Sequence, residues 1–87
     1  MKTIKVITWE DIPSFYTGIV EYANGDKVWY LNGKIHREDG PAVECVDGHK
    51  EWRLNGDRHH VYGPAVEWAN GNKEYWIYGE LVPKEVQ

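Results

Sequence analysis

Apolar and polar residues alternate in short runs along most of this chain, with the two-residue period of a β-strand. The first run of each pair ends at an Asn-Gly or Asp-Gly dipeptide: residues 24–25, 47–48 and 70–71. Such a dipeptide between alternating runs is the strongest short-range signal of a β-hairpin. The second run ends at a further turn: residues 32–33, 55–56 or 78–79. No segment has an extended helical period, so the chain is predicted to be all-β.

The same runs recur at a spacing of 23 residues. Aligning each Val-Glu pair, with the Gly four residues after the Glu, gives three copies without insertions: 17–39, 40–62 and 63–85. Copies at such a spacing bury a common core by stacking, so residues 17–87 are predicted to form, together with residues 1–16, one single domain. The expected fold is an antiparallel meander of three hairpin repeats in one twisted sheet. Residues 1–16 lie outside the copies and are expected to form a strand and a turn that cap the domain.

The hairpin turns also predict which residues share a face of the sheet. If Asn24 and Gly25 are the central residues of a type I′ turn, Val20 lies opposite Trp29, and opposite residues share a face. In all three copies this register gives one apolar face, composed of Val20, Tyr22, Trp29, Leu31, Val43, Cys45, Trp52, Leu54, Val66, Trp68, Tyr75 and Ile77.

The other face is predicted to be polar and is the candidate partner-binding surface. In this register Glu44 lies opposite Glu51, and two like charges in that position require water or a cation. An exposed stripe of two aromatics and an arginine beside such a row is typical of a protein interface. The predicted partner-binding residues are Glu21, Tyr30, Glu44, Glu51, Arg53, Glu67, Glu74 and Trp76.

The apolar face must be covered, because a single sheet cannot leave it in water. Residues 1–16 carry enough apolar side chains to fold back as a lid, and this is the favoured cover. Alternatively, two copies of the chain stack face to face as a homodimer. The two arrangements are compatible with each other.

Composition and charge narrow the class of partner. The net charge is −4 and the chain has no basic stripe, so binding to a nucleic-acid backbone is not expected. An acidic surface instead fits a partner protein with a basic surface. The single cysteine, Cys45, cannot form an internal disulfide, which favours a cytoplasmic location. The N-terminus lacks the pattern of a signal peptide, and no apolar stretch is long enough to span a membrane.

Candidate catalytic and metal-binding groups are few. A zinc site needs three or four converging ligands, and the spacing of the four histidines does not imply convergence. His36 and His59 occupy equivalent positions and are expected to hydrogen-bond neighbouring backbone at the corner of each copy. The only serine, Ser14, is remote from any histidine in the repeat scheme. The chain is therefore expected to bind no metal or cofactor and not to be an enzyme.

One segment of copy one carries a family pattern: Asn32-Gly33-Lys34-Ile35-His36-Arg37-Glu38-Asp39-Gly40-Pro41-Ala42. It resembles the MORN-type repeat, and more narrowly a variant, Asn-Gly-Lys-x-His-Arg-x-Asp-Gly-Pro-Ala, found in uncharacterised proteins of phages, large viruses and bacteria. The resemblance covers residues 17–81 and implies a scaffold of hairpins that presents a surface to partners. Copy two departs from the pattern near its end, which makes that corner a candidate adapted site: His59, His60 and Tyr62.

The expected function is a non-catalytic protein-binding module. The resemblance narrows this to a small phage-type inhibitor of a host defence or nucleic-acid-processing protein, of the anti-CRISPR or anti-restriction class, in the host cytoplasm. Two alternatives stay open. One is a binder or sponge for small ligands such as nucleotides, with a pocket between the sheet and residues 1–16; the other is a purely structural homo-oligomer.

Overall fold

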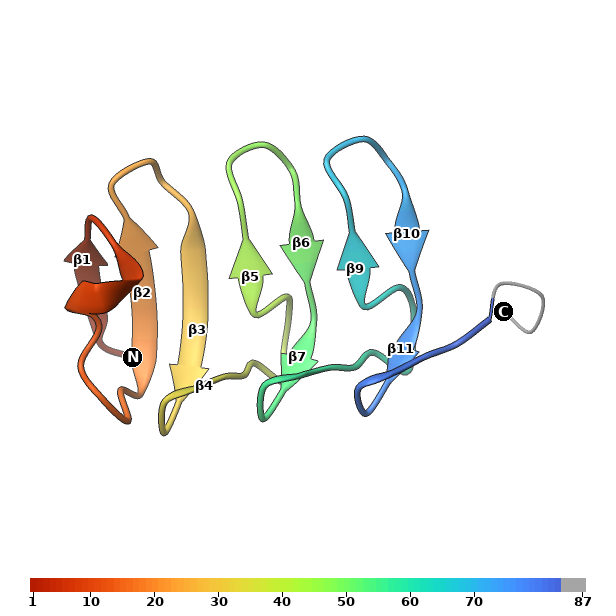
Figure 1. The fold of residues 1–87 in the computed structure, drawn as a ribbon, viewed down its shortest axis with the longest axis horizontal. Helices are drawn as coiled ribbons and strands as arrows, with labels where there is room; N and C mark the ends of the chain where they lie inside the picture. The colour runs from red at the N-terminus through yellow and green to blue at the C-terminus, as the bar shows by residue number, and fades with distance from the viewer. Residues whose placement is uncertain (84–87) are drawn as a thin grey trace.

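The computed structural model describes residues 1–83 and shows an all-β fold built of antiparallel hairpins, as the turn signals predict (Figure 1). An open eight-stranded sheet has the order β1-β2-β3-β5-β6-β9-β10, with β4 paired to β3. Two small two-stranded sheets, β7-β8 and β11-β12, accompany it. The predicted third copy ends at residue 85, so its end lies outside the described residues.

The strands are short, and the following list gives their bounds. They are β1 (Thr3–Val6), β2 (Gly18–Tyr22), β3 (Lys27–Leu31), β4 (Lys34–Ile35), β5 (Val43–Glu44), β6 (Lys50–Glu51), β7 (Arg53–Leu54), β8 (Asp57–Arg58), β9 (Val66–Glu67), β10 (Lys73–Glu74), β11 (Trp76–Ile77) and β12 (Glu80–Leu81).

The N-terminal strand departs from the expected meander. β1 pairs in parallel with β2, and the 3₁₀ turn η1 (Trp9–Asp11) lies in the connection between them. The carbonyl of Lys2 accepts hydrogen bonds from the backbone N–H of Ile19 (2.7 Å) and from the hydroxyl of Tyr16 (3.2 Å). This close approach requires Gly18, because a Cβ at that position would lie 2.5 Å from the Lys2 oxygen. Residues 1–16 therefore extend the sheet as an edge strand before they cover part of it.

The predicted type I′ geometry of the first turn in each copy is wrong. Positive φ occurs at Gly25, Gly48 and Gly71 but not at the residue before each of them. The Tyr22 N–H donates to the Asp26 carbonyl at 2.8 Å, so three residues form the loop, with the glycine in the left-handed position. The side chain decides this geometry: the oxygen of Asn24 accepts the N–H two residues later, at 3.0 Å. The Asp47 and Asn70 side chains accept equivalent bonds, and such Asx turns hold the residue out of the left-handed region.

The extra loop residue shifts every hairpin register by one, which changes the faces of the sheet. Val20 lies opposite Val28, and Ile19 opposite Trp29. Because neighbouring residues of a strand point to opposite faces, the second strand of each hairpin is reversed relative to the prediction. We call the two faces inner and outer. Their central rows are Ile4, Val20, Val28, Val43, Glu51, Val66 and Glu74 for the inner face, and Lys5, Glu21, Lys27, Glu44, Lys50, Glu67 and Lys73 for the outer face.

The outer row alternates in charge from one edge of the sheet to the other, and we call it the charge ladder. Glu44 lies opposite Lys27 and Lys50, so the predicted juxtaposition of Glu44 with Glu51 is wrong. The predicted pairing of Glu67 with Glu74 is wrong for the same reason. The predicted apolar face is also divided between two faces, since six of its members alternate onto the outer face: Trp29, Leu31, Trp52, Leu54, Tyr75 and Ile77.

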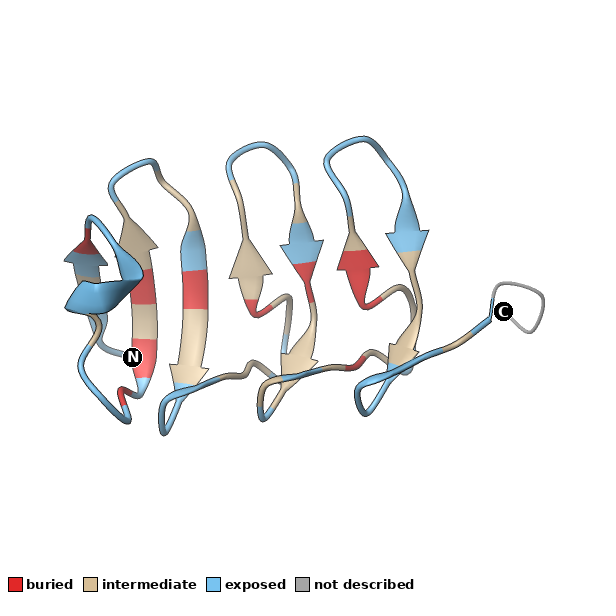
Figure 2. Cartoon of the chain, viewed as in Figure 1, coloured by how far each residue is buried: buried red, intermediate tan, exposed pale blue. Residues whose placement is uncertain are grey.

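A cluster of buried apolar residues lies at the N-terminal end of the inner face, and Ala42, Ala65 and Val66 are buried further along the sheet (Figure 2). Val6, Tyr16 and Val20 form the buried centre of the cluster, and the rings of Tyr16 and Tyr30 meet edge to face with centroids 6.5 Å apart. Residues 1–16 thus cover the inner face of copy one only. Where that cover ends, the repeat position of Val28 carries Glu51 and Glu74, and that of Tyr30 carries Arg53 and Trp76.

Candidate functional site

The eight predicted partner-binding residues do not share one surface. Tyr30, Arg53 and Trp76 lie on the inner face, together with Glu51 and Glu74. The remaining three, Glu21, Glu44 and Glu67, lie on the outer face within the charge ladder. Each of these glutamates has a lysine opposite it on both sides, so the row is not an acidic patch.

Glu51 is the centre of an ion-pair network on the inner face of copy two. Its side chain is largely buried, with 8% of the residue exposed. One carboxylate oxygen lies 2.7 Å from Arg53 Nη2 and 3.5 Å from Arg58 Nε, and the other lies 2.7 Å from His49 Nε2. Burial raises the pKa of Glu51, but the hydrogen bonds from His49 and Arg53 and the arginine charges outweigh it, so the pKa lies below its usual value. Glu51, at the centre of this network, stands at the repeat position that Val28 occupies in copy one.

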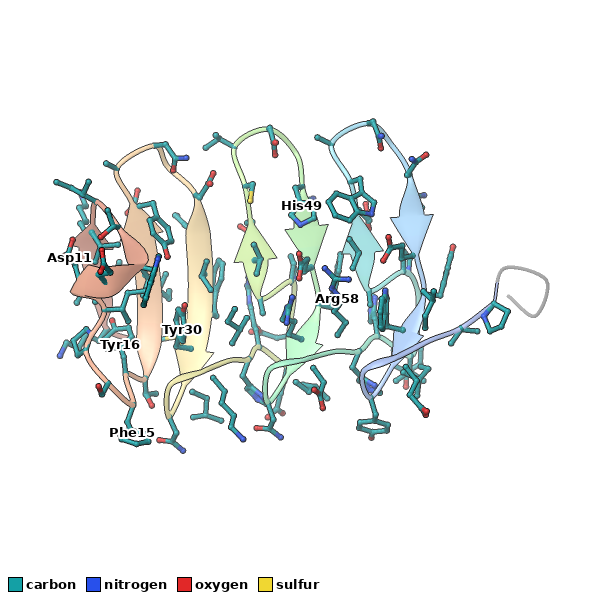
Figure 3. All side chains as sticks on the ribbon, viewed as in Figure 1. Asp11, Phe15, Tyr16, Tyr30, His49 and Arg58 are labelled. Atoms are coloured by element: carbon teal, nitrogen blue, oxygen red, sulfur yellow. The ribbon has the colours of Figure 1, made fainter. Side chains whose placement is uncertain are left out.

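Arg58 joins this network to copy three, and Figure 3 shows it in the space between β6 and β9. Its guanidinium lies 3.6 Å from a carboxylate oxygen of Glu74 and 5.1 Å from the ring centre of Trp76. Glu74 also accepts the indole N–H of Trp76 at 2.9 Å and that of Trp68 at 3.0 Å. Trp76 therefore helps to hold copies two and three together, while Arg53 is held within copy two by Glu51 and the Gly56 carbonyl, and these contacts leave both side chains less available to a partner.

Two histidines connect successive copies through the backbone, as predicted. His36 Nδ1 accepts the N–H of Asn55 at 2.9 Å, and His59 Nδ1 accepts the N–H of Tyr78 at 2.9 Å. These acceptor roles assign the ring proton to Nε2 in both side chains. In copy one, Thr17 Oγ1 supplies the corresponding acceptor for the N–H of Asn32 at 2.8 Å. Within residues 1–83, no group of three or more His, Cys, Asp or Glu side chains is placed to hold a metal ion.

Cys45 is a poor candidate for a nucleophile. Burial raises the pKa of its thiol to about 11, and the nearby carboxylates of Asp26 and Asp47 add to the increase. A thiol with such a pKa is almost entirely protonated near neutral pH.

Arg37 and His60 occupy equivalent positions and make equivalent contacts. The Arg37 guanidinium lies 4.0 Å from the ring centre of Trp29, and the His60 ring stacks on Trp52 with centroids 4.6 Å apart and planes 5° apart. Each side chain also bonds the carbonyl of the proline four residues later, at 3.1 Å for Arg37 and 2.9 Å for His60. The departure at His60 therefore preserves the architecture of the corner.

The predicted adapted corner lines a groove on the outer face, which we call the corner groove. Its volume is about 710 Å³, within the range of ligand and anchor sites. One wall is the loop 36–40 of copy one and the other is 59–62 of copy two, with Trp52 and Leu54 between them. Large side chains remain exposed there, most of all Tyr62, which is 94% exposed. His59, His60 and Tyr62 are thus brought together in one concave site.

Two exposed aromatic residues with positive φ, Phe15 and Tyr78, were not among the predicted site residues. Tyr78 lines the corner groove, is 69% exposed and has φ 46°, at a turn position where Asn32 and Asn55 stand in the other copies. Phe15 is 82% exposed with φ 57°, and Figure 3 shows its ring pointing away from the body of the molecule. A bulky residue is an outlier in this region. The sequence did carry a signal for Tyr78, because a tyrosine stands there at a type I′ turn position where the other two copies have asparagine.

The pocket expected between the sheet and residues 1–16 is small. It has a volume of about 220 Å³ and is lined by Trp9, Ile12, Phe15 and Tyr30, among others. This is less than the usual volume of a small-molecule site.

None of the family models, curated proteins or solved structures with which the chain was compared matches it. Within residues 1–83, nothing forms a helix with the length and apolar character needed to cross a membrane.

Proposed function

We propose that this chain is a non-catalytic protein-binding module whose corner groove takes a segment of a partner protein. The observation that carries the proposal is the exposure of Val61, Tyr62 and Tyr78 around a groove of about 710 Å³. Large apolar side chains that a fold leaves exposed around a hollow are typical of protein interaction sites. Tyrosine is also among the residues that dominate binding energy at interfaces.

The walls of the groove favour a particular chemistry in the partner. Within the wall formed by the loop 36–40, Arg37 lies 2.9 Å from an oxygen of Asp39, and it also lies 3.3 Å from one of Glu44, which has Lys27 and Lys50 opposite it in the charge ladder. Glu38 lies beside them, and its carboxylate lies 3.3 Å from His36 Nε2. The wall thus has an excess of negative charge, which fits an apolar anchor residue flanked by Lys or Arg.

The histidine contacts support a non-catalytic role. His36 and His59 are held by backbone N–H groups, and His60 by a proline carbonyl and the Trp52 ring. In His36 and His59 these bonds occupy the Nδ1 lone pair and leave the ring proton on Nε2, so neither ring offers a free lone pair to a substrate proton or a metal ion.

The narrower form of the proposal is a small phage-type inhibitor of a host defence or nucleic-acid-processing protein, acting in the host cytoplasm. This form rests on the resemblance to the MORN-type repeat variant. It requires the partner to be a host protein with a basic surface.

The test starts from affinity capture in a lysate of the native host, followed by purification of the captured protein. We expect that protein to bind the wild-type chain, and the variant Tyr62→Ser to bind at least about 30-fold more weakly, since loss of an interface hot spot costs about 2 kcal/mol or more. Ile7→Ser removes another highly exposed apolar side chain, on the N-terminal segment, and serves as the matched control. Equal affinity of wild type and Tyr62→Ser would refute the groove as the binding site.

A further inference from the structure

The outer edge of β10 is the one end of the repeat array that has no following copy within the described residues. Inside the chain, the N–H of Trp29 donates to the Ala42 carbonyl at 2.8 Å, and the N–H of Trp52 donates to the Ala65 carbonyl at 2.7 Å. Tyr75 stands at the same position in copy three. Its carbonyl accepts the N–H of Val82, while its own N–H has no acceptor among residues 1–83. In the part of the chain that the structure describes, the edge thus has an unpaired backbone N–H at the position where Trp29 and Trp52 each donate a hydrogen bond to the next copy.

The side chains along this edge also match the two internal junctions. At the first junction Lys27 lies opposite Glu44, and at the second Lys50 lies opposite Glu67. The charge ladder ends on Lys73, which has Glu67 on one side and no acidic residue on the other within the described chain. On the inner face, Val43 lies opposite Val28 at the first junction and Val66 lies opposite Glu51 at the second. A strand that continues the pattern would therefore place an acid opposite Lys73 and an apolar β-branched residue opposite Glu74.

A hollow lies along the same edge. Its volume is about 730 Å³, and its lining includes Lys73, Glu74 and Tyr75 from the strand side and Leu81 from the chain that follows β11. Trp68 and Leu81 both line it and are 40% and 58% exposed. The edge therefore has room and apolar surface beside its free backbone groups.

We infer that the β10 edge is a docking site for an extended strand of a partner protein that carries the sequence small residue, β-branched apolar residue, acid, and that pairs antiparallel with β10. The carbonyl of the small residue accepts the Tyr75 N–H, and the acid faces Lys73. This mode is β-strand addition, in which backbone hydrogen bonds provide affinity and alternate side chains provide specificity. It does not depend on the corner groove, which is lined by other residues.

A second copy of this chain does not fit the site. Its segments with the required sequence, Ala42–Glu44 and Ala65–Glu67, are already paired on both sides. The other free edge, β1, carries Lys5 in the ladder row and would face Lys73 in a head-to-tail array. Two β10 strands related by a two-fold axis would place Lys73 opposite Lys73 or Glu74 opposite Glu74, and like charges in that position are destabilising. Charge repulsion at this edge therefore disfavours pairing with a second copy of the chain, whereas Lys73 favours pairing with a strand that carries an acidic residue.

The experiment titrates the full-length, ¹⁵N-labelled chain with a synthetic peptide of residues 62–69, Tyr-Gly-Pro-Ala-Val-Glu-Trp-Ala, which pairs with β6 inside the chain. Up to about 2 mM peptide covers the weak affinity of a single added strand. We expect the amide signal of Tyr75 to shift and its hydrogen exchange to slow about tenfold at saturation. A peptide with Glu67→Lys should bind about two- to fivefold more weakly.

The variant Lys73→Glu should reverse this preference between the two peptides. Lys73 is exposed, so the change leaves the buried residues in place, and the spectrum of the free variant confirms its fold. The inference is overturned if Tyr75 shows no change up to the highest peptide concentration, or if Lys73→Glu and wild type prefer the same peptide.

Discussion

The Nδ1 atom of His36 lies 2.9 Å from the backbone nitrogen of Asn55, which belongs to the next copy of the repeat. His59 has the same relation to Tyr78, and Thr17 Oγ1 has it to Asn32. Each second turn is thus anchored on a side chain of the preceding segment. The threonine serves this purpose in copy one, which follows residues 1–16 and not another copy.

Replacement of the buried histidine tests this anchoring. His59→Leu leaves the N–H of Tyr78 without its acceptor in a partly buried site, so we expect unfolding to become easier by about 1–3 kcal/mol. His36→Leu is the matched control, because the Asn55 N–H is exposed and can bond water. Urea unfolding of both variants measures the difference. An equal loss of stability in both variants would contradict the idea that the unpaired N–H is costly because it is buried.

Two glycines with similar φ separate backbone strain from steric contact. Gly33 and Gly56 have φ 83° and 87°, but a Cβ at Gly33 would lie 3.1 Å from the Cα of Phe15, whereas a Cβ at Gly56 meets nothing within 4 Å. We expect Gly56→Ala to cost about 1–2 kcal/mol of stability from the positive φ alone. Gly33→Ala should cost about 1 kcal/mol more, because the covering segment must move. Thermal unfolding of the pair gives the difference, and the reverse order would show that residues 12–16 do not pack on this turn.

Phe15 combines a positive φ with an exposed ring, so the folded state gains little from its side chain. Phe15→Asn and Phe15→Gly are expected to raise the free energy of unfolding by up to about 1 kcal/mol, since both residues tolerate the left-handed region. Phe15→Val should lower it, because a β-branched residue is the least compatible with that region. The prediction fails if valine is tolerated as well as asparagine in denaturant titrations.

The Glu51 network predicts a specific dependence of stability on pH. The pKa of Glu51 in the folded chain lies below its usual 4.5, so its contribution to stability is present above that pH and is lost as the pH falls through the folded value. Glu51→Gln should therefore be about 1–3 kcal/mol less stable than wild type at pH 7. The gap should narrow below pH 4.5. Denaturant titrations from pH 7 to pH 3 measure it, with Glu80→Gln, at an exposed position, as the control.

The charge ladder predicts a salt-dependent penalty for reversing one of its lysines. Lys50→Glu would place three glutamates side by side, so we expect a loss of about 1 kcal/mol at low ionic strength. Salt near 0.5 M should remove most of the loss, because screening is strong for exposed charges. Lys34→Glu makes the same change of net charge outside the ladder and should cost little. If Lys50→Glu is as stable as Lys34→Glu at low salt, the ladder does not exist in solution.

Local patterns predicted the class of fold because they depend only on neighbouring residues. The alternating runs and the Asn-Gly and Asp-Gly turns gave an all-β chain of hairpins, and the structure confirms it. The backbone role of His36 and His59 was also predicted, since both stand at equivalent corner positions. The grouping of His59, His60 and Tyr62 at one corner followed from their adjacency in the chain.

The faces of the sheet could not be obtained in this way. An Asn-Gly pair is compatible with a two-residue or a three-residue loop, and the Asx bond of Asn24 selects the second. One residue of difference moves Trp29, Trp52 and Tyr75 to the outer face and separates Glu44 from Glu51, because side chains alternate at every residue. The predicted partner surface therefore divides between two faces.

By itself, the sequence determined that this protein is a chain of β-hairpins with turns at defined places, because turn propensity and periodicity are local properties. The tertiary structure decided which residues meet. It placed β1 parallel to β2, paired Glu44 with Lys50, enclosed Glu51 among arginines, and left the corner groove and the β10 edge open. The parallel pairing and the corner groove depend on contacts between segments that are far apart in the chain. The pairing of Glu44 and the surroundings of Glu51 depend on the length of a turn, which the alternation of apolar and polar residues does not specify.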